Sequence, residues 1–321
     1  MRRAIIGAAV AALTTMCLAG AGEAKAPGSN GRISYSQALP DGGALVLTAR
    51  PDGTDVHQVP MPYLNEDFGR AVWSPDSSKL LISNVLRFDG NGDLLPFRPA
   101  TVNPDGSDYH LLTMPWAPFD SYCSTWSPGG TRILCGLGGD QPGIFSIRAS
   151  DGADPIRLTS TRFQDQPGDY SPDGRRIVFV RFDDGVAPVR EDVDNRTALF
   201  VMNADGTGQR EITPFGIPAA HEAAGAAWSP DGALVISATR DGRLFTVRPD
   251  GSRFSPIRLQ LGGGNYFAFA PVFAPDGTRI VFSALVGGAA DVYSAKPDGS
   301  DVRQLTTNPL PERFPDWGSA A

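Results

Sequence analysis

Histidine and cysteine, the side chains that most often carry catalysis and metal binding, are scarce in this chain. The 321 residues include three His and three Cys. The sequence has no His-Glu-x-x-His zinc motif, no Gly-x-Ser-x-Gly nucleophile turn and no phosphate-binding glycine loop. Neither cysteine beyond the N-terminal segment has the nearby His expected of a nucleophile. We therefore assign no catalytic residue from the sequence.

Clusters of basic residues are lacking as well. The chain carries 28 Lys and Arg against 35 Asp and Glu, a formal net charge of −7, without any basic run. Nucleic acids and anionic membrane surfaces are bound by clustered Lys and Arg, so the composition argues against both as partners.

The N-terminal segment, residues 1–26, has the pattern of a signal peptide. Two arginines precede an apolar run over residues 4–19 that is too short and alanine-rich for a membrane span, and small residues follow. A lipoprotein signal at Cys17 would need Leu and a small residue where Thr14 and Met16 stand, so a plain signal peptide is favoured. We expect cleavage within about residues 21–26. The mature protein is then periplasmic or secreted and has no membrane span.

An aromatic residue followed by Ser-Pro-Asp-Gly, or a near copy of it, divides the rest of the chain into similar lengths. The copies are Trp73-Ser74-Pro75-Asp76-Ser77, Trp126-Ser127-Pro128-Gly129-Gly130, Tyr170-Ser171-Pro172-Asp173-Gly174, Trp228-Ser229-Pro230-Asp231-Gly232 and Phe273-Ala274-Pro275-Asp276-Gly277. A sixth aromatic in step is Trp317, and successive aromatics lie 44 to 58 residues apart. A repeat of this length is typical of a β-propeller blade.

An Asp-Gly that follows a short apolar run recurs six times, offset from the aromatic motif. Its glycines are Gly53, Gly106, Gly152, Gly206, Gly251 and Gly299. Such a turn, with Gly in the left-handed conformation, closes a β-hairpin. Short runs of branched and aromatic residues stand on both sides, such as residues 176–180 and 198–202 before a turn and 210–213 after it. With the strand that leads into the aromatic, each unit has four antiparallel strands, as in a propeller blade.

The sixth blade is expected to combine both ends of the chain. Trp317 ends an innermost strand, and the strand that should follow it is found at the other end, where residues 31–36 resemble residues 278–283. Residues 43–50 and 56–59 then supply the outer strands. We therefore predict an all-β, six-bladed propeller over residues 27–321, closed so that no sheet edge is left open, as one domain and a monomer.

Cys123 and Cys135 flank the hairpin at residues 128–130. Pairing Ser127 with Thr131 across this turn places the two cysteines directly opposite each other on adjacent strands. In an oxidising compartment this arrangement allows a cross-strand disulfide. The alternative is two buried free thiols, because directly opposed positions often strain the bridge.

Two connections between second and third strands are long, residues 84–99 and 181–197. Long loops on a rigid scaffold are where function tends to reside. The first contains Asp89, Asn91 and Asp93, whose alternating oxygen-bearing side chains are similar to the start of a calcium loop but lack the Gly and Glu of an EF-hand. A looser Ca²⁺ site is one hypothesis, and an ordinary glycine-rich turn is the alternative.

The connections between blades place acidic or polar side chains near the expected mouth of the central channel. They are Asp67, Asp120, Asp165, His221, Glu222 and Glu312. A ring of carboxylates suits a cation or a basic peptide, whereas side chains at a repeated position also cap backbone groups at strand ends. Trp116, the one Trp outside the repeated motif, is a candidate stacking platform for a sugar or peptide, or else packs under its loop.

Each repeat of the chain consists of Trp-Ser-Pro-Asp-Gly, a strand such as residues 279–283, Asp-Gly-Ser/Thr and Leu-Thr. This unit resembles the propeller repeats of the TolB family, which are similar to WD repeats. The resemblance covers residues 31–318 and implies the six-bladed fold. It also implies partner binding, because TolB proteins bind proteins of the Tol-Pal envelope system through the propeller and an additional N-terminal domain. The signal peptide expected here leaves no room for that domain. Propellers of this type also precede peptidase domains and form lyases of pectic oligosaccharides.

These patterns together predict an exported, non-enzymatic module. Its expected partner is a protein or peptide of the cell envelope, or a carbohydrate, bound on the face that carries the two long loops. The alternative is a propeller-based lyase or hydrolase that acts on an oligosaccharide or small ester with a divalent metal at the channel mouth. That alternative requires several of the channel-mouth side chains to converge within metal-ligand distance.

Overall fold

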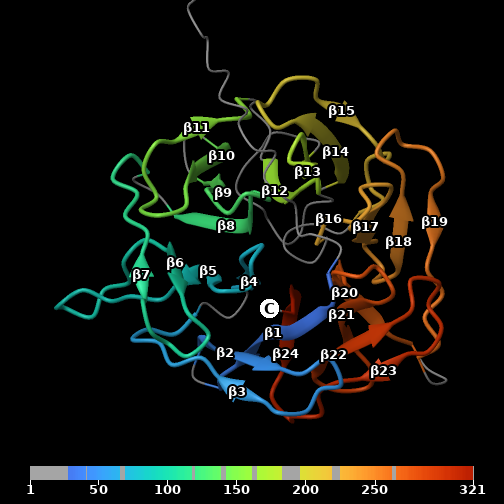
Figure 1. Cartoon of the computed structure of the whole chain (residues 1–321), viewed down its shortest axis with the longest axis horizontal. Coiled ribbons are helices and arrows are strands. Elements are labelled where there is room, and N and C mark those ends of the chain that lie inside the picture. Colours follow the sequence, from blue (N-terminus) through green and yellow to red (C-terminus); the bar gives the residue numbers. More distant parts are fainter. Residues whose placement is uncertain are drawn as a thin grey trace, which may run out of the picture.

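The computed structural model describes residues 28–40, 42–65, 69–117, 120–138, 142–160, 165–182, 196–218, 225–261 and 265–320. Within these ranges the regular structure is entirely β, with six four-stranded antiparallel sheets arranged as the blades of a ring (Figure 1). The predicted six-bladed propeller is confirmed. The predicted signal peptide, residues 1–26, lies outside the described residues. No helix in the described ranges is long and apolar enough to cross a membrane.

The blades are numbered in chain order, from the inner strand outward. Blade 1 comprises β4 (Ala71–Trp73), β5 (Leu80–Val85), β6 (Arg98–Val102) and β7 (His110–Leu111). Blade 2 comprises β8 (Ser121–Trp126), β9 (Arg132–Leu137), β10 (Gly143–Arg148) and β11 (Ile156–Arg157). Blade 3 comprises β12 (Asp165–Tyr170), β13 (Arg176–Phe182), β14 (Thr197–Asn203) and β15 (Arg210–Glu211).

The remaining blades follow the same order, but the sixth draws on both ends of the chain. Blade 4 comprises β16 (Ala227–Trp228), β17 (Val235–Ala238), β18 (Leu244–Val247) and β19 (Ser255–Pro256). Blade 5 comprises β20 (Phe267–Phe273), β21 (Ile280–Leu285), β22 (Ala290–Ala295) and β23 (Arg303–Gln304). Blade 6 comprises β24 (Glu312–Ser319), β1 (Asn30–Ala38), β2 (Ala44–Ala49) and β3 (His57–Gln58).

Both kinds of repeated turn lie at the same end of each blade, because they join the first strand to the second and the third to the fourth. We call this end the turn face and the opposite end, with the remaining connections, the loop face. The Asp-Gly glycines have positive φ, as expected, and Gly53 at +83° is one example. A Cβ on Gly53 would lie 2.2 Å from the carbonyl oxygen of Leu305, so the turn also needs Gly for close approach to the neighbouring blade.

The outermost strands are shorter than the sequence suggested. Residues 210–213 were expected to form a strand, but β15 contains only Arg210 and Glu211, both exposed. Ile212 turns inward and is buried, while its N–H still donates to the Leu199 carbonyl at 2.8 Å. Short, charged outer strands give a neighbouring sheet little to pair with.

The apolar core lies between blades rather than at one centre. Val72 of blade 1 belongs to the same buried cluster as Ile133 of blade 2, and the other large clusters likewise join neighbouring blades. The aromatic side chains of the repeated motif pack between neighbouring blades in these clusters. The indole N–H of Trp126 donates to the Val72 carbonyl at 3.2 Å, and that of Trp228 donates to the Asp169 carbonyl at 3.1 Å. Each blade therefore needs both neighbours to bury its faces.

The two ends of the chain meet in blade 6, as predicted. Strand β1 pairs antiparallel with β24, with Ile33 opposite Trp317 and Gln37 opposite Glu312. The Gln37 amide also donates to the Glu312 carboxylate at 3.1 Å. This seam completes the sixth sheet and closes the ring.

The predicted disulfide is present, but the expected pairing of the hairpin is wrong by one residue. The Ser127 N–H donates to the Arg132 carbonyl at 2.8 Å rather than pairing with Thr131. A β-bulge between Cys123 and Thr125 then adds a residue on the other strand, which restores Cys123 to a position opposite Cys135. The bridge joins these two buried side chains of β8 and β9, with Cα atoms 3.9 Å apart.

We expect removal of the disulfide to lower stability without changing the fold. The bridge spans 12 residues, and closing a loop of that size in the unfolded chain is worth about 3 kcal/mol. Denaturant unfolding of the protein should shift to a lower midpoint on reduction, and the Cys123→Ala/Cys135→Ala variant should show the same shift. Reductant should leave the double variant unaffected. Equal midpoints for the oxidised and reduced protein would contradict this assignment.

Glu312 should make the stability of the seam dependent on pH. Burial, with a smaller contribution from the nearby Asp291 carboxylate, raises the pKa of Glu312 above its usual range. The folded protein therefore binds the Glu312 proton more tightly than the unfolded chain does. The stabilisation from the protonated carboxyl is present below the usual pKa of Glu and is lost as pH rises through the folded pKa. Glu312→Gln keeps an acceptor for Gln37 and should raise the melting temperature at pH 7 but hardly at pH 4.

The control for Glu312→Gln is Glu211→Gln, on the exposed outer strand β15. Melting curves at the two pH values should show little difference between this control and the unmodified protein. A Glu312→Gln variant that is equally destabilised at both pH values would contradict the proposed effect of ionisation.

Candidate functional site

The predicted channel-mouth residues do not form one cluster in the described part of the chain. Asp67, His221 and Glu222 lie outside the described residues. Asp120 immediately precedes β8, and its carboxylate accepts the Phe97 N–H at 2.9 Å. This is the capping arrangement that the sequence left as an alternative.

Asp165 and Glu312 are the first residues of two inner strands, and both are buried. The Asp165 carboxylate forms a two-point ion pair with Arg181, with nitrogen–oxygen distances of 2.7 and 2.9 Å. Glu312 accepts from Gln37 across the seam. Both carboxylates thus bond to the adjacent strand of their own blade.

The predicted calcium residues form a tight turn. One carboxylate oxygen of Asp89 accepts the backbone N–H groups of Asn91 and Asp93, at 2.8 and 2.9 Å. These hydrogen bonds lower the pKa of Asp89. Gly92, with φ at +86°, completes the turn. Across the described ranges, no group of three or more His, Cys, Asp or Glu side chains is arranged to hold a metal ion.

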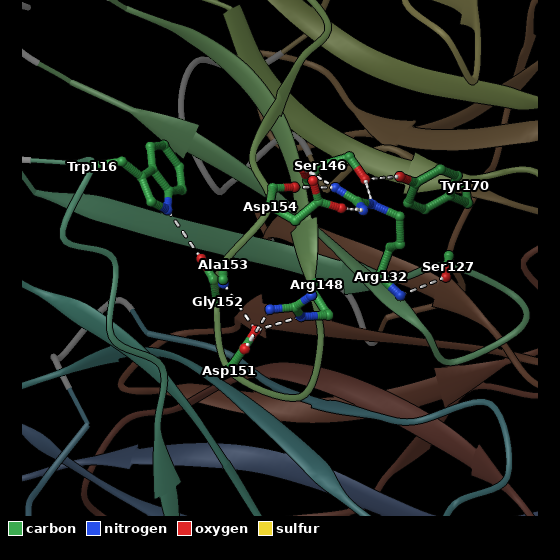
Figure 2. Close-up of polar contacts among 10 residues, drawn as sticks. All are labelled: Trp116, Ser127, Arg132, Ser146, Arg148, Asp151, Gly152, Ala153, Asp154 and Tyr170. Atoms are coloured by element: carbon green, nitrogen blue, oxygen red, sulfur yellow. Dashed lines mark hydrogen bonds and ion pairs between the residues drawn. The ribbon is translucent and has the colours of Figure 1, made fainter.

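Trp116 lies between blades 1 and 2 and is half-buried. Its indole N–H donates to the carbonyl of Gly152 at 3.0 Å, in the Asp-Gly turn of blade 2 (Figure 2). Its ring centre lies 5.3 Å from that of Phe145. Arg148 and Asp151 form an ion pair at 2.7 Å within the same turn (Figure 2). The contacts of Trp116 are therefore those of a side chain that packs one blade against the next.

The inner strands enclose a small central cavity. Its part nearer the turn face has a volume of about 80 Å³ and is bordered by the motif prolines Pro75, Pro128, Pro172, Pro230 and Pro275. A second part of about 40 Å³ is lined by Arg70, Asn84, Tyr122 and Gln166, among others. The acidic residues of the first part, Asp169 and Asp316, accept the backbone N–H groups of Trp228 at 3.3 Å and Trp73 at 2.8 Å. These carboxylates join blades to one another.

Residues 86–97, between β5 and β6, form a hairpin that we call the blade 1 hairpin. Phe88 pairs with Leu94 in an antiparallel bridge, and the Leu95 N–H donates to the Arg87 carbonyl at 2.9 Å. The Leu86 N–H donates to the Leu64 carbonyl at 3.0 Å, which fixes the first half of the hairpin. The second half is fixed by the Phe97 N–H, which donates to the Asp120 carboxylate. The first of the two predicted long loops is thus an ordered element of the loop face, whereas residues 183–195 of the second lie outside the described residues.

Exposed apolar side chains gather around this hairpin. Eight large apolar residues are exposed in the described ranges, and four of them are Tyr63, Leu64, Phe88 and Leu94. Phe88 has an exposed fraction of 61% and Leu94 of 53%. These residues were not among the predicted site residues, although Phe88 and Leu94 flank the Asp-Gly-Asn-Gly-Asp turn on both sides. They make the blade 1 hairpin the best candidate for a binding surface.

The chain is similar to TolB proteins in part of its sequence. It is 35% identical over 94 residues to the Tol-Pal system protein TolB of Anaeromyxobacter dehalogenans, which corresponds to 28% of this chain. The matched region spans only 20% of the length of that relative. A longer match, 28% identical over 255 residues, covers 66% of this chain and 79% of the uncharacterized protein Atu1656 of Agrobacterium fabrum. No protein-family profile matches the chain.

Solved structures share the fold of this chain. The crystal structure of TolB from Acinetobacter baumannii aligns with a TM-score of 0.65 and 18% identity, over 90% of this chain and 67% of that one. An oligogalacturonate lyase from Vibrio parahaemolyticus aligns with a TM-score of 0.52 and 14% identity, over 88% and 74% of the two chains. Identities this low indicate a shared fold alone. The repeated motif, the six closed blades and these matches together show a TolB-like β-propeller.

Proposed function

We propose that this protein is an exported, non-enzymatic binding module that engages a protein or peptide of the cell envelope through its loop face. The observation that carries the proposal is the exposed apolar group on the blade 1 hairpin and the segment beside it. Apolar side chains that are exposed together on a soluble propeller commonly mark a protein contact. The name of the TolB relatives, a Tol-Pal system protein, agrees with an envelope role.

Export is part of the proposal and rests on residues 1–26. The two arginines, the apolar run and the small residues that follow have the order of a signal peptide with cleavage at about residues 21–26. The Cys123–Cys135 disulfide agrees with an oxidising compartment, the periplasm or the exterior.

The arrangement of the described carboxylates also supports binding over catalysis. A lyase or hydrolase with a metal at the channel mouth needs several side chains aimed at one ion. Asp120, Asp165 and Glu312 instead bond to a backbone amide, an arginine and a glutamine of the protein itself. We therefore place the functional surface on the rim of the ring, at the blade 1 hairpin.

Site-specific photo-crosslinking tests the proposal in the cells that make the protein. A photoreactive residue in place of Leu94 should give one discrete adduct with another exported protein, because this side chain is exposed at the proposed contact. The same residue in place of Ile156 is the matched control, since Ile156 is 46% exposed but lies on the outer strand β11. Adducts of equal yield at both positions, or at neither, would count against the loop face as a binding surface.

A further inference from the structure

The blade 1 hairpin presents its two exposed apolar residues on one side. Phe88 and Leu94 stand opposite each other in the antiparallel bridge, and directly paired residues project to the same face of a ribbon with Cβ atoms about 5 Å apart. Their exposed fractions, 61% and 53%, are the largest among the exposed large apolar residues of the described ranges. The hairpin therefore carries one compact apolar surface at its end.

Negative charge borders this apolar surface. Asp89 follows Phe88 and Asp93 precedes Leu94, so each apolar residue has a carboxylate beside it in the chain. The two amide hydrogen bonds to Asp89 stabilise its ionised form, and Asp93 is exposed. The nearby cations are directed to the base of the hairpin. Arg87 donates to the Pro96 carbonyl at 3.1 Å, and Arg98 donates to the Phe97 and Ala117 carbonyls.

The hairpin is also held in place before any partner arrives. Leu64 fixes one strand through its carbonyl, and Asp120 and Ser121 fix the other at Phe97. A preformed element loses little conformational entropy on binding, so its apolar area contributes more fully to affinity.

The charge around the apolar surface selects among possible occupants. The chain has a formal net charge of −7, so a second copy would bring like charges together, and an anionic lipid surface would repel the two aspartates in the same way. A partner with positive charge around an apolar groove matches both features. We infer that the blade 1 hairpin inserts Phe88 and Leu94 into an apolar groove of a protein partner and that Asp89 and Asp93 meet Lys or Arg side chains on its rim.

This inference deepens the proposed function and rests on it, because it names the chemistry of the partner at the same surface. It predicts that binding weakens with salt, since the charges at the rim of such a contact are exposed and therefore screened. It also predicts that the apolar residues and the aspartates act together, so that loss of either weakens binding.

The probe is a short, fluorescently labelled amphipathic peptide whose leucine stripe is bordered by lysines, with a leucine and glutamate peptide of the same pattern for comparison. Fluorescence anisotropy with the mature protein should show binding of the lysine peptide and little binding of the glutamate peptide. Phe88→Ser/Leu94→Ser should weaken binding of the lysine peptide by about tenfold. The matched control is Val56→Ser/Ile156→Ser, which removes apolar residues that are 50% and 46% exposed, the first just before the outer strand β3 and the second on the outer strand β11.

Charge reversal separates local recognition from general attraction to an acidic protein. Asp93→Lys should weaken binding of the lysine peptide several-fold more than Asp241→Lys, although both change the net charge equally. Asp241 is a suitable control because its side chain is 77% exposed in the β17–β18 turn, also on the loop face. All four variants alter exposed residues and should melt within a few degrees of the unmodified protein.

Equal effects of Asp93→Lys and Asp241→Lys, or unchanged binding by Phe88→Ser/Leu94→Ser, would overturn the inference. A dimer in sedimentation analysis that Phe88→Ser/Leu94→Ser dissociates would also overturn it, because the occupant would then be a second copy. These failures differ from failure of the proposed function. If the adduct at Leu94 forms in cells while the peptide shows no charge preference, the loop face still binds a protein but the partner lacks a basic rim.

Discussion

Closure of the ring by the two ends of the chain is the constraint on which the rest of the structure depends. Strand β1 pairs with β24, and the indole N–H of Trp317 donates at 3.1 Å to the carbonyl of Gly31, 286 residues away in sequence. The entropic cost of closing a loop rises only slowly with its length, so a pairing this distant in sequence adds little further free-energy cost to folding. Without it, blade 6 lacks its inner strand, and the apolar faces of its two neighbours lose their cover.

The same need for contact between blades accounts for the polar lining of the central cavity. Asp316 precedes Trp317 and accepts the N–H of Trp73 in blade 1, and Asp169 precedes Tyr170 and accepts the N–H of Trp228 in blade 4. A buried N–H left without an acceptor costs about 1–3 kcal/mol, so these carboxylates contribute to cohesion of the ring. Asp169 and Asp316, which border the central cavity in the described part of the chain, are thus engaged in holding blades together. The exposed apolar residues of the rim are therefore the stronger candidates for a binding surface.

The fold could be predicted because a regular repeat determines it almost alone. Six aromatics at similar spacing and six Asp-Gly turns define six blades, whichever residues fill them. The disulfide was also predicted, but through two errors that cancel. The turn after Trp126 contains one more residue than the pairing assumed, and the bulge at Ser124 adds one on the opposite strand. Bulges interrupt other inner strands, as at Gly168, and counting from a turn cannot locate them.

The contacts of the candidate site residues could not be predicted, because sequence order does not give side-chain direction. Asp165 and Glu312 were placed at the channel mouth from their position before an inner strand, yet each bonds to the adjacent strand of its own blade. A repeated ion pair was missed for the same reason. Arg132 bonds to Asp154 in blade 2 (Figure 2), as Arg279 bonds to Asp301 in blade 5. These pairs link the start of the second strand to the Asp-Gly turn, and their regular spacing in the sequence is the signal that could have revealed them.

The rigid ring allows the blade 1 hairpin to expose apolar side chains and still keep its structure. A two-stranded ribbon is marginally stable by itself in water, and exposed Phe and Leu side chains add little to its folding. Here the ribbon draws its order from hydrogen bonds at its base, to the Leu64 carbonyl on one side and the Asp120 carboxylate on the other. Phe88 and Leu94 are therefore not needed to hold their own backbone in place. Their substitution should leave the propeller intact, so a loss of binding in such variants would report on the interface itself.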